Sequence, residues 1–260
     1  MKKYELTTNT KMCFGRKLYQ IKALKDFGNV KAGDLGGYIE KEENLSQDGI
    51  AWVFDNACVC DNACVCDNAR VLCNAYVCGN ACVYDNAQIY DNARICDDVC
   101  IYGKARVYGD ARVFGNACVC DDAEVFDNAR VYGDAKVFDN AYVCDNAEVF
   151  DNAYVCDNAE VFDNARVLGN AQVYGTTWIH CDAQISSNAD YICFKGFGSE
   201  NRNTIMFKTK NGDVHVCCGC FEGSLKEFKE KVKETHGNTK YAKEYLACIE
   251  VARIHFEIDE

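Results

Sequence analysis

The sequence predicts a mainly β protein built around a three-sided parallel solenoid with 18 residues per coil. Three observations predict this fold. A six-residue unit, Ala-x-Val-x-Asp-Asn, recurs from Ala51 to Asn188 without insertion or deletion, every unit has Val or Ile at its third position, and the 260-residue chain contains no proline. A unit this short cannot bury an apolar face alone, so consecutive units must stack. Proline would interrupt the backbone hydrogen bonds that stacking requires.

Each unit divides into a four-residue extended segment and a two-residue corner. In the first unit side chains alternate, so Ala51 and Val53 are expected to point inward and Trp52 and Phe54 outward. Asp, Gly and Asn at the corner tolerate the left-handed backbone that a tight bend needs. Three sides close one coil, and twenty-three units therefore give about 7.7 coils.

The phrase Val-x-[Asp/Gly]-Asn-Ala-x resembles the hexapeptide repeat of left-handed β-helix proteins, a family that includes many acyltransferases. The lead-in VKAGDLGGYI (30–39) resembles bacterial and phage proteins labelled putative transferases or polymer-forming proteins. The segments CGCF (218–221) and KVKETHG (231–237) resemble the tail of phage-borne members of that group. The resemblance implies a left-handed parallel β-helix and a phage or prophage origin.

Three domains are expected: an N-terminal β-rich cap at 1–44, the solenoid at 45–190, and a C-terminal α+β module at 191–260. Caps are needed because the two ends of a solenoid leave open strand edges. In the C-terminal module, 204–210 and 213–217 predict a hairpin around Asn211-Gly212. Ser224 and Glu227 predict a capping box before a helix that ends at Gly237, and a second helix follows from about Thr239, which gives a ββαα order.

The net charge of −12 is concentrated in the repeat, where residues 51–188 carry 21 Asp and Glu against 8 Lys and Arg. Stacked corner carboxylates keep the rod in solution and weigh against direct nucleic-acid binding. They could also imitate the phosphate rows of DNA, so an acidic decoy of a host nucleic-acid-binding protein stays an alternative. No apolar run is long enough to span a membrane and the start lacks a signal-peptide core, so a cytoplasmic location is expected.

Residues eighteen apart are expected to lie above one another, so the outer faces form columns. The column Arg94, Arg112 and Arg130, beside Phe114 and Tyr132, is the candidate binding site, because stacked Arg next to aromatic rings can hold an anionic or flat ligand. The alternative is that these arginines stack on each other and pair with nearby carboxylates. The apolar columns also predict that at least one face is covered by another copy, a cap or a partner.

The chain has 20 cysteines, which a cytoplasmic protein keeps mostly as free thiols. The column Cys64, Cys82, Cys100 and Cys118 is expected to fill space, because a straight column does not give the tetrahedral convergence that zinc needs. In the C-terminal module, Cys218, Cys220 and His215 are the candidate zinc ligands, although strand alternation directs only the two cysteines to one face.

The sequence favours a non-catalytic scaffold or binding protein that acts through protein–protein contacts and uses no cofactor. The resemblance implies an alternative, a trimeric hexapeptide-repeat acyltransferase that uses His180 at the groove between rods and binds acetyl-CoA. The uninterrupted repeat lacks the projecting loop such enzymes often carry, and the three neighbouring His of related zinc enzymes are absent. A protein partner or self-association, such as a homotrimer, is therefore expected.

Overall fold

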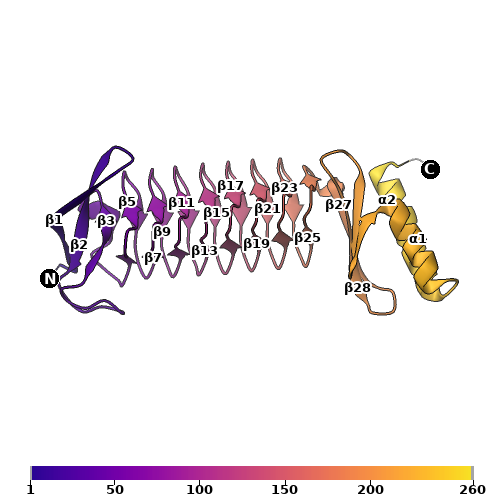
Figure 1. The fold of residues 1–260 in the computed structure, drawn as a ribbon, viewed down its shortest axis with the longest axis horizontal. Helices are drawn as coiled ribbons and strands as arrows, with labels where there is room; N and C mark the ends of the chain where they lie inside the picture. Colours follow the sequence, from indigo (N-terminus) through magenta and orange to yellow (C-terminus); the bar gives the residue numbers. More distant parts are fainter. Residues whose placement is uncertain (1, 259–260) are drawn as a thin grey trace.

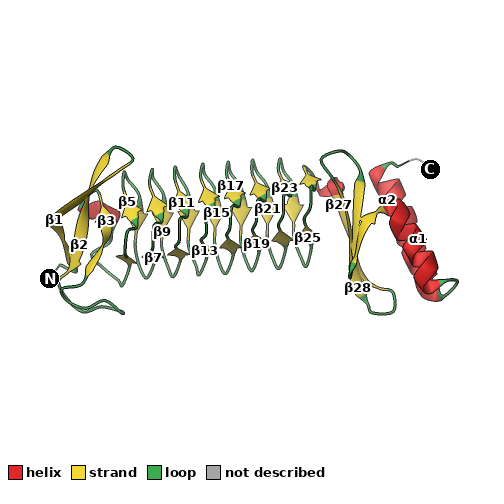
Figure 2. Cartoon of the chain, viewed as in Figure 1, coloured by secondary structure: helices red, strands yellow, loops and turns green. Residues whose placement is uncertain are grey.

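The structure, a computed structural model, describes residues 2–258 and has the shape of a rod (Figure 1). N-terminal strands close one end, and a small sheet with two α-helices closes the other, so the two termini lie at opposite ends (Figures 1 and 2). The predicted architecture is confirmed as a parallel β-solenoid of about eight turns with 18 residues per turn. Within the described residues, neither α-helix has the length and apolarity needed to cross a membrane.

Three sheets form the sides of the solenoid. Sheet 1 contains β1 (Tyr4–Cys13), β2 (Arg16–Ala23), β3 (Leu35–Ile39), β5 (Cys58–Val59), β8 (Tyr76–Val77), β11 (Arg94–Ile95), β14 (Arg112–Val113), β17 (Arg130–Val131), β20 (Glu148–Val149), β23 (Arg166–Val167) and β26 (Gln184–Ile185). Sheet 2 contains β4 (Trp52–Val53), β7 (Arg70–Val71), β10 (Gln88–Ile89), β13 (Arg106–Val107), β16 (Glu124–Val125), β19 (Tyr142–Val143), β22 (Glu160–Val161) and β25 (Trp178–Ile179). Sheet 3 contains β6 (Cys64–Val65), β9 (Cys82–Val83), β12 (Cys100–Ile101), β15 (Cys118–Val119), β18 (Lys136–Val137), β21 (Tyr154–Val155) and β24 (Gln172–Val173).

The core is the column of inward Val, Ile and Ala side chains. The Val or Ile at the third position of every unit is fully buried, as is nearly every Ala at the first position. Two units have a residue other than Ala at the first position, and both of these residues are buried as well. Val99 is fully buried, and the Thr177 hydroxyl donates a hydrogen bond to the Tyr174 carbonyl oxygen at 2.8 Å. The predicted inward positions are therefore confirmed.

The first corner residue of each unit adopts a left-handed backbone. From residue 55 to residue 181, all twenty-two of these corners have positive φ, and they are thirteen Asp, seven Gly and two Cys. Adding a Cβ at Gly79 would place it 2.5 Å from the Asp97 backbone nitrogen in the next turn, so this corner is tight as well as left-handed. Asp and Gly dominate because they adopt this conformation at the lowest cost.

The corner Asp also bonds the next turn. Its carboxylate accepts a hydrogen bond from the backbone N–H of the corner eighteen residues later, for example at 3.0 Å between Asp97 Oδ2 and Gly115 N and at 2.8 Å between Asp157 Oδ2 and Gly175 N. The second corner position adds a side-chain ladder, in which Asn62 Nδ2 donates to Asn80 Oδ1 at 3.1 Å. Much of the acidic charge that the sequence places at corners thus has a structural role.

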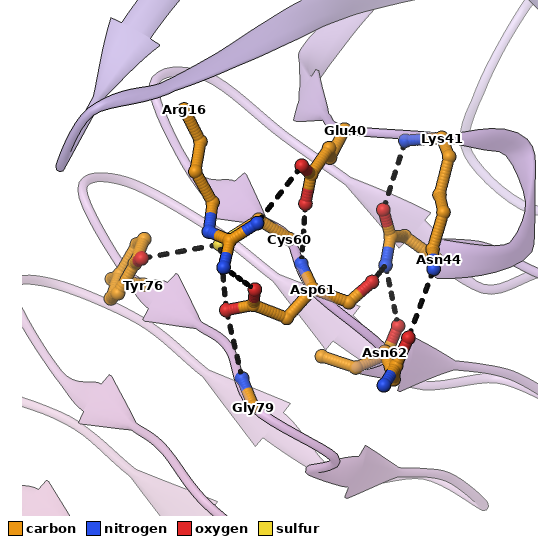
Figure 3. Close-up of polar contacts among 10 residues, drawn as sticks. Arg16, Glu40, Lys41, Asn44, Cys60, Asp61, Asn62, Tyr76 and Gly79 are labelled. Carbon is orange, nitrogen blue, oxygen red and sulfur yellow. Dashed lines mark hydrogen bonds and ion pairs between the residues drawn. The ribbon is translucent and has the colours of Figure 1, made fainter.

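The N-terminal cap is joined to the first turns by a polar network (Figure 3). Arg16 of β2 forms ion pairs with Glu40, at 3.1 Å, and with Asp61, while Asp61 N donates to Glu40 Oε2 at 2.6 Å. Asn44 Nδ2, in the 3-10 helix η1 (Glu42–Asn44), donates to the Ala63 carbonyl oxygen at 2.8 Å. Strand β3 pairs in parallel with β5, so the cap extends sheet 1 and covers its open edge.

The C-terminal module follows a second 3-10 helix, η2 (Asn188–Asp190). Its sheet 4 contains β27 (Tyr191–Phe197), β28 (Arg202–Lys208), β29 (Val214–Cys218) and β30 (Phe221–Ser224), and α1 (Leu225–His236) and α2 (Lys240–Phe256) follow. The predicted hairpin is confirmed as β28–β29, with β27 and β30 added at its two edges. The predicted capping box is also confirmed, with Ser224 N donating to Glu227 Oε2 at 2.8 Å.

Sheet 4 lies between the end of the solenoid and the helices. Ile205, Phe207 and Cys217 belong to the same buried cluster as the solenoid core. Met206 and Val216, which alternate with them along the strands, pack against α1 and α2. Because side chains of a strand alternate between faces, one sheet both caps the solenoid and carries the helices.

We expect Asp97→Ala to lower the free energy of unfolding by about 1.5–3 kcal/mol, because it removes the acceptor of the Gly115 N–H and places Ala in a left-handed backbone. Asp97→Asn keeps both an acceptor and a residue type suited to this corner, so it should cost well under half as much. Urea denaturation and amide hydrogen exchange at Gly115 measure the two effects. Asp110→Ala, at an exposed second corner position whose carboxylate makes no hydrogen bond or ion pair within residues 2–258, is the control, and equal losses for Asp97→Ala and Asp110→Ala would contradict the proposed role.

Candidate functional site

The first candidate site is the Arg–aromatic face of sheet 1. Strands β11, β14 and β17 pair in register, so Arg94 lies opposite Arg112 and Arg112 opposite Arg130. All three side chains are exposed. The Phe114 and Tyr132 rings, which directly follow β14 and β17, stack at 4.9 Å between centroids with an interplanar angle of 2°. The structure thus brings all five residues predicted for binding onto one surface.

The two ends of this Arg column make contacts that its middle does not make. Arg130 pairs with Glu148 at 3.4 Å, and the Arg94 guanidinium lies 5.6 Å from the centre of the Phe14 ring in the β1–β2 loop. Within residues 2–258 Arg112 forms no ion pair with a carboxylate. The exposed positive charge at the centre of this face therefore comes with flat apolar rings beside it, a combination that attracts anionic and aromatic groups.

Stacking reduces the apolar surface that the columns leave open. Tyr90, Tyr108 and Phe126 on sheet 2 stack at 4.7 and 5.0 Å, with planes within 4° of parallel. Among the described solenoid aromatics, the large exposed ones are Tyr142, Tyr174 and Trp178. The N-terminal cap covers the start of sheet 1, where Phe14 packs against Tyr76 at 4.7 Å.

A second candidate site is the thiol column on sheet 3. Cys82, Cys100 and Cys118 pair in register, as predicted, and all are free thiols. The neighbouring Cys120 thiol and Tyr102 hydroxyl lower the pKa of the Cys118 thiol to about 7 in spite of its partial burial. Burial instead raises the pKa of Cys100. One thiol of the column is therefore chemically distinct from its neighbours.

His180, the candidate catalytic residue of the acyltransferase alternative, lies at the junction between the last turn and sheet 4. Its ring stacks on Phe162 at 4.8 Å and meets Phe207 of β28 edge-on at 5.6 Å. Only 4% of the residue is exposed. Its Nδ1 lies 3.1 Å from Cys181 Sγ and its Nε2 lies 3.0 Å from Cys217 Sγ. His180 is thus covered by the C-terminal module instead of facing an open groove.

The predicted zinc ligands of the C-terminal module do not converge. Cys218 lies on the helix-facing side of β29, with its Sγ 3.1 Å from Thr204 Oγ1. Cys220 is exposed in the turn before β30. His215 lies on the solenoid-facing side, with its ring 6.0 Å from the ring of His180. Burial, and the nearby His180, lower the pKa of His215 below its usual value.

A different group of metal-ligating side chains meets at this junction. Cys181 belongs to two triads whose donor atoms all lie within 4.8 Å of one another, one with Asp163 and His180 and the other with His215 and Glu222. Sequence reasoning missed Cys181, Asp163 and Glu222. A signal was present, since Cys181 stands at a corner where Asp or Gly is usual. No sequence pattern indicated that sheet 4 would place His215 and Glu222 beside Cys181.

Comparison with known proteins supports the repeat type. The family described as the YdcK beta-solenoid repeat matches residues 87–103 and 105–121, which are two consecutive turns of the rod. A comparison with curated proteins finds no match. The chain is therefore similar to YdcK-type solenoid repeats in the middle of its rod.

We expect Cys118 to react with iodoacetamide at pH 7 more than tenfold faster than Cys100, its neighbour in the column. A thiol with a pKa of about 7 is half thiolate at that pH, whereas a thiol of ordinary or raised pKa is only a few per cent thiolate or less. Mass spectrometry of timed digests gives the two rates, and Tyr102→Phe should slow Cys118 by removing the hydroxyl. Equal rates at Cys100 and Cys118 would show that Cys120 and Tyr102 do not stabilise the Cys118 thiolate.

Proposed function

We propose that this protein is a non-catalytic scaffold that binds a protein partner through the Arg–aromatic face of sheet 1. The observation that carries the proposal is the exposed column of Arg94, Arg112 and Arg130, held in register beside the stacked Phe114 and Tyr132. Repetition of one side-chain type along a sheet makes an extended surface, which suits recognition of a protein segment.

The geometry gives little support to the acyltransferase alternative. His180 is buried beneath Phe207, and the solenoid has no loop between its units that could carry a catalytic group or fold over a cofactor. Enzymes usually place their chemistry on such loops. The repeated surface therefore favours binding over catalysis.

The chemistry of the face indicates the kind of partner. Arg guanidinium groups bind carboxylates in a planar, bidentate manner and also stack on rings, and Phe114 and Tyr132 add flat apolar area. The partner is then a protein segment with acidic and aromatic or apolar side chains. A phage or prophage origin, which the sequence resemblance implies, would make that partner a bacterial cytoplasmic protein.

A triple variant tests the binding face. With the full chain as bait in bacterial cytoplasmic extract, Arg94→Gln, Arg112→Gln and Arg130→Gln together should reduce capture of the specific partner at least tenfold, because the cationic column is lost. Quantitative mass spectrometry of the eluted proteins measures the change. Once the partner is known, its dissociation constant, measured with purified protein at two salt concentrations, should show a salt dependence that the triple variant loses.

The matched control also removes three cations, through Arg70→Gln on sheet 2, Lys136→Gln on sheet 3 and Lys104→Gln at the exposed corner between β12 and β13. This control should capture the partner as the wild type does. Equal loss in both variants would show that only net charge matters and would contradict a specific face. If the wild type captures nothing and analytical ultracentrifugation shows a trimer that persists in the triple variant, self-association through another surface is the correct function.

A further inference from the structure

The junction between the last turn of the solenoid and sheet 4 collects side chains that metals prefer. The solenoid contributes Asp163, His180 and Cys181, and the C-terminal sheet contributes His215 of β29 and Glu222 of β30. Elsewhere in the rod, outward side chains of neighbouring turns form parallel columns. Here the sheet crosses the end of the rod, so side chains from two directions point at one another.

The distances among Asp163, His180 and Cys181, the solenoid half of the cluster, fit a tetrahedrally coordinated ion. His180 Nδ1 lies 3.1 Å from Cys181 Sγ and 3.7 Å from Asp163 Oδ2. With zinc–ligand bonds of about 2.0–2.3 Å, the ligand atoms of a regular tetrahedral site lie roughly 3.3–3.8 Å from one another. An ion at this point therefore requires only small side-chain movements.

The second triad places two further potential metal ligands beside the same thiol. An imidazole nitrogen of His215 and a carboxylate oxygen of Glu222 lie within 4.8 Å of Cys181 Sγ and of each other. The buried Nε2 of His215 has no hydrogen-bond partner in the described part of the chain. A buried polar nitrogen without a partner is costly, and coordination would satisfy it.

Two features prepare the solenoid half for coordination. Cys217 Sγ lies 3.0 Å from His180 Nε2, so it can fix the ring orientation while Nδ1 faces Cys181. A partner on the second ring nitrogen is usual for metal-bound histidine. Cys181 itself occupies a left-handed corner with φ of 55°, where Asp and Gly fit better. The fold alone therefore does not require a cysteine here.

The site also has an entrance. Asp163, Cys181 and His215 line a surface cavity of about 830 Å³ between the last turns and the C-terminal module. An ion can reach the thiol from solvent through this cavity, and the thiol proton can leave by the same route.

We propose that this junction is a zinc site, with Cys181 as its central ligand and with the other ligands drawn from the two triads that share this thiol, Asp163 and His180 of the solenoid and His215 and Glu222 of sheet 4. Zinc prefers four ligands of this mixed sulfur, nitrogen and oxygen type. Its ligands come from both the solenoid and sheet 4, so the ion joins the C-terminal module to the rod. On binding, the Cys181 thiol releases its proton to solvent and sulfur donates an electron pair to the ion.

Cys181→Gly is the decisive variant because Gly already occupies the same corner in seven units and suits its positive φ. Cys73→Gly is the matched control, since Cys73 is the other cysteine at a first corner and belongs to neither triad. Reduced, chelator-treated full-length protein is titrated with Zn²⁺ against a chromophoric chelator and, separately, with Co²⁺. Circular dichroism confirms that each variant folds.

We expect the wild type and Cys73→Gly to bind one zinc ion at this site, and Cys181→Gly to lose at least 100-fold in affinity for it. The cobalt complex should show thiolate-to-cobalt charge-transfer absorption that only Cys181→Gly abolishes. His215→Gln should weaken zinc binding at least tenfold while the thiolate absorption remains. The proposal is overturned if the wild type binds no zinc, or if Cys181→Gly binds zinc and cobalt as Cys73→Gly does.

Discussion

The left-handed backbone at the first corner of each unit is the constraint on which the rest of the solenoid depends. It turns the chain after every four extended residues, and the corner Asp then accepts a hydrogen bond from the same corner of the next turn, as Asp97 does from Gly115. Bend and stacking are thus coupled in one residue. This coupling holds the turns in an eighteen-residue register, and the register is what lets Val and Ala form a continuous buried core.

The same register decides what the outer faces can do. Each side chain meets its counterpart in the turns above and below, so rings stack at about 5 Å and cover one another. Like charges meet in the same way, and the Arg column is short, ending at Glu148 on one side and at Tyr76, which packs against Phe14, on the other. A solenoid side therefore presents extended surfaces of similar groups. Such surfaces suit recognition of another macromolecule better than catalysis, which needs different groups that converge on one point.

Within residues 2–258, side chains from outside the repeat approach those of the repeat at its two ends. At the C-terminal end, β29 and β30 cross the last turn, and His215 and Glu222 approach Cys181 from outside the repeat. At the N-terminal end a similar crossing produces a network of Arg16, Glu40 and Asp61, which holds the cap in place (Figure 3). The chemically varied parts of this protein are thus its two junctions, and the rod between them sets their separation.

The solenoid, its inward positions, its corners and its columns could be predicted from the sequence alone, because these follow from a short period and from local backbone preferences. The β28–β29 hairpin and the Ser224 capping box could be predicted as well, since both depend on neighbouring residues. Three placements could be read only from the folded chain: sheet 4 covers His180, Cys218 and His215 lie on opposite sides of β29, and His215 lies near Cys181. Those placements join segments far apart in the chain, and they depend on how whole elements pack, which a local pattern does not specify.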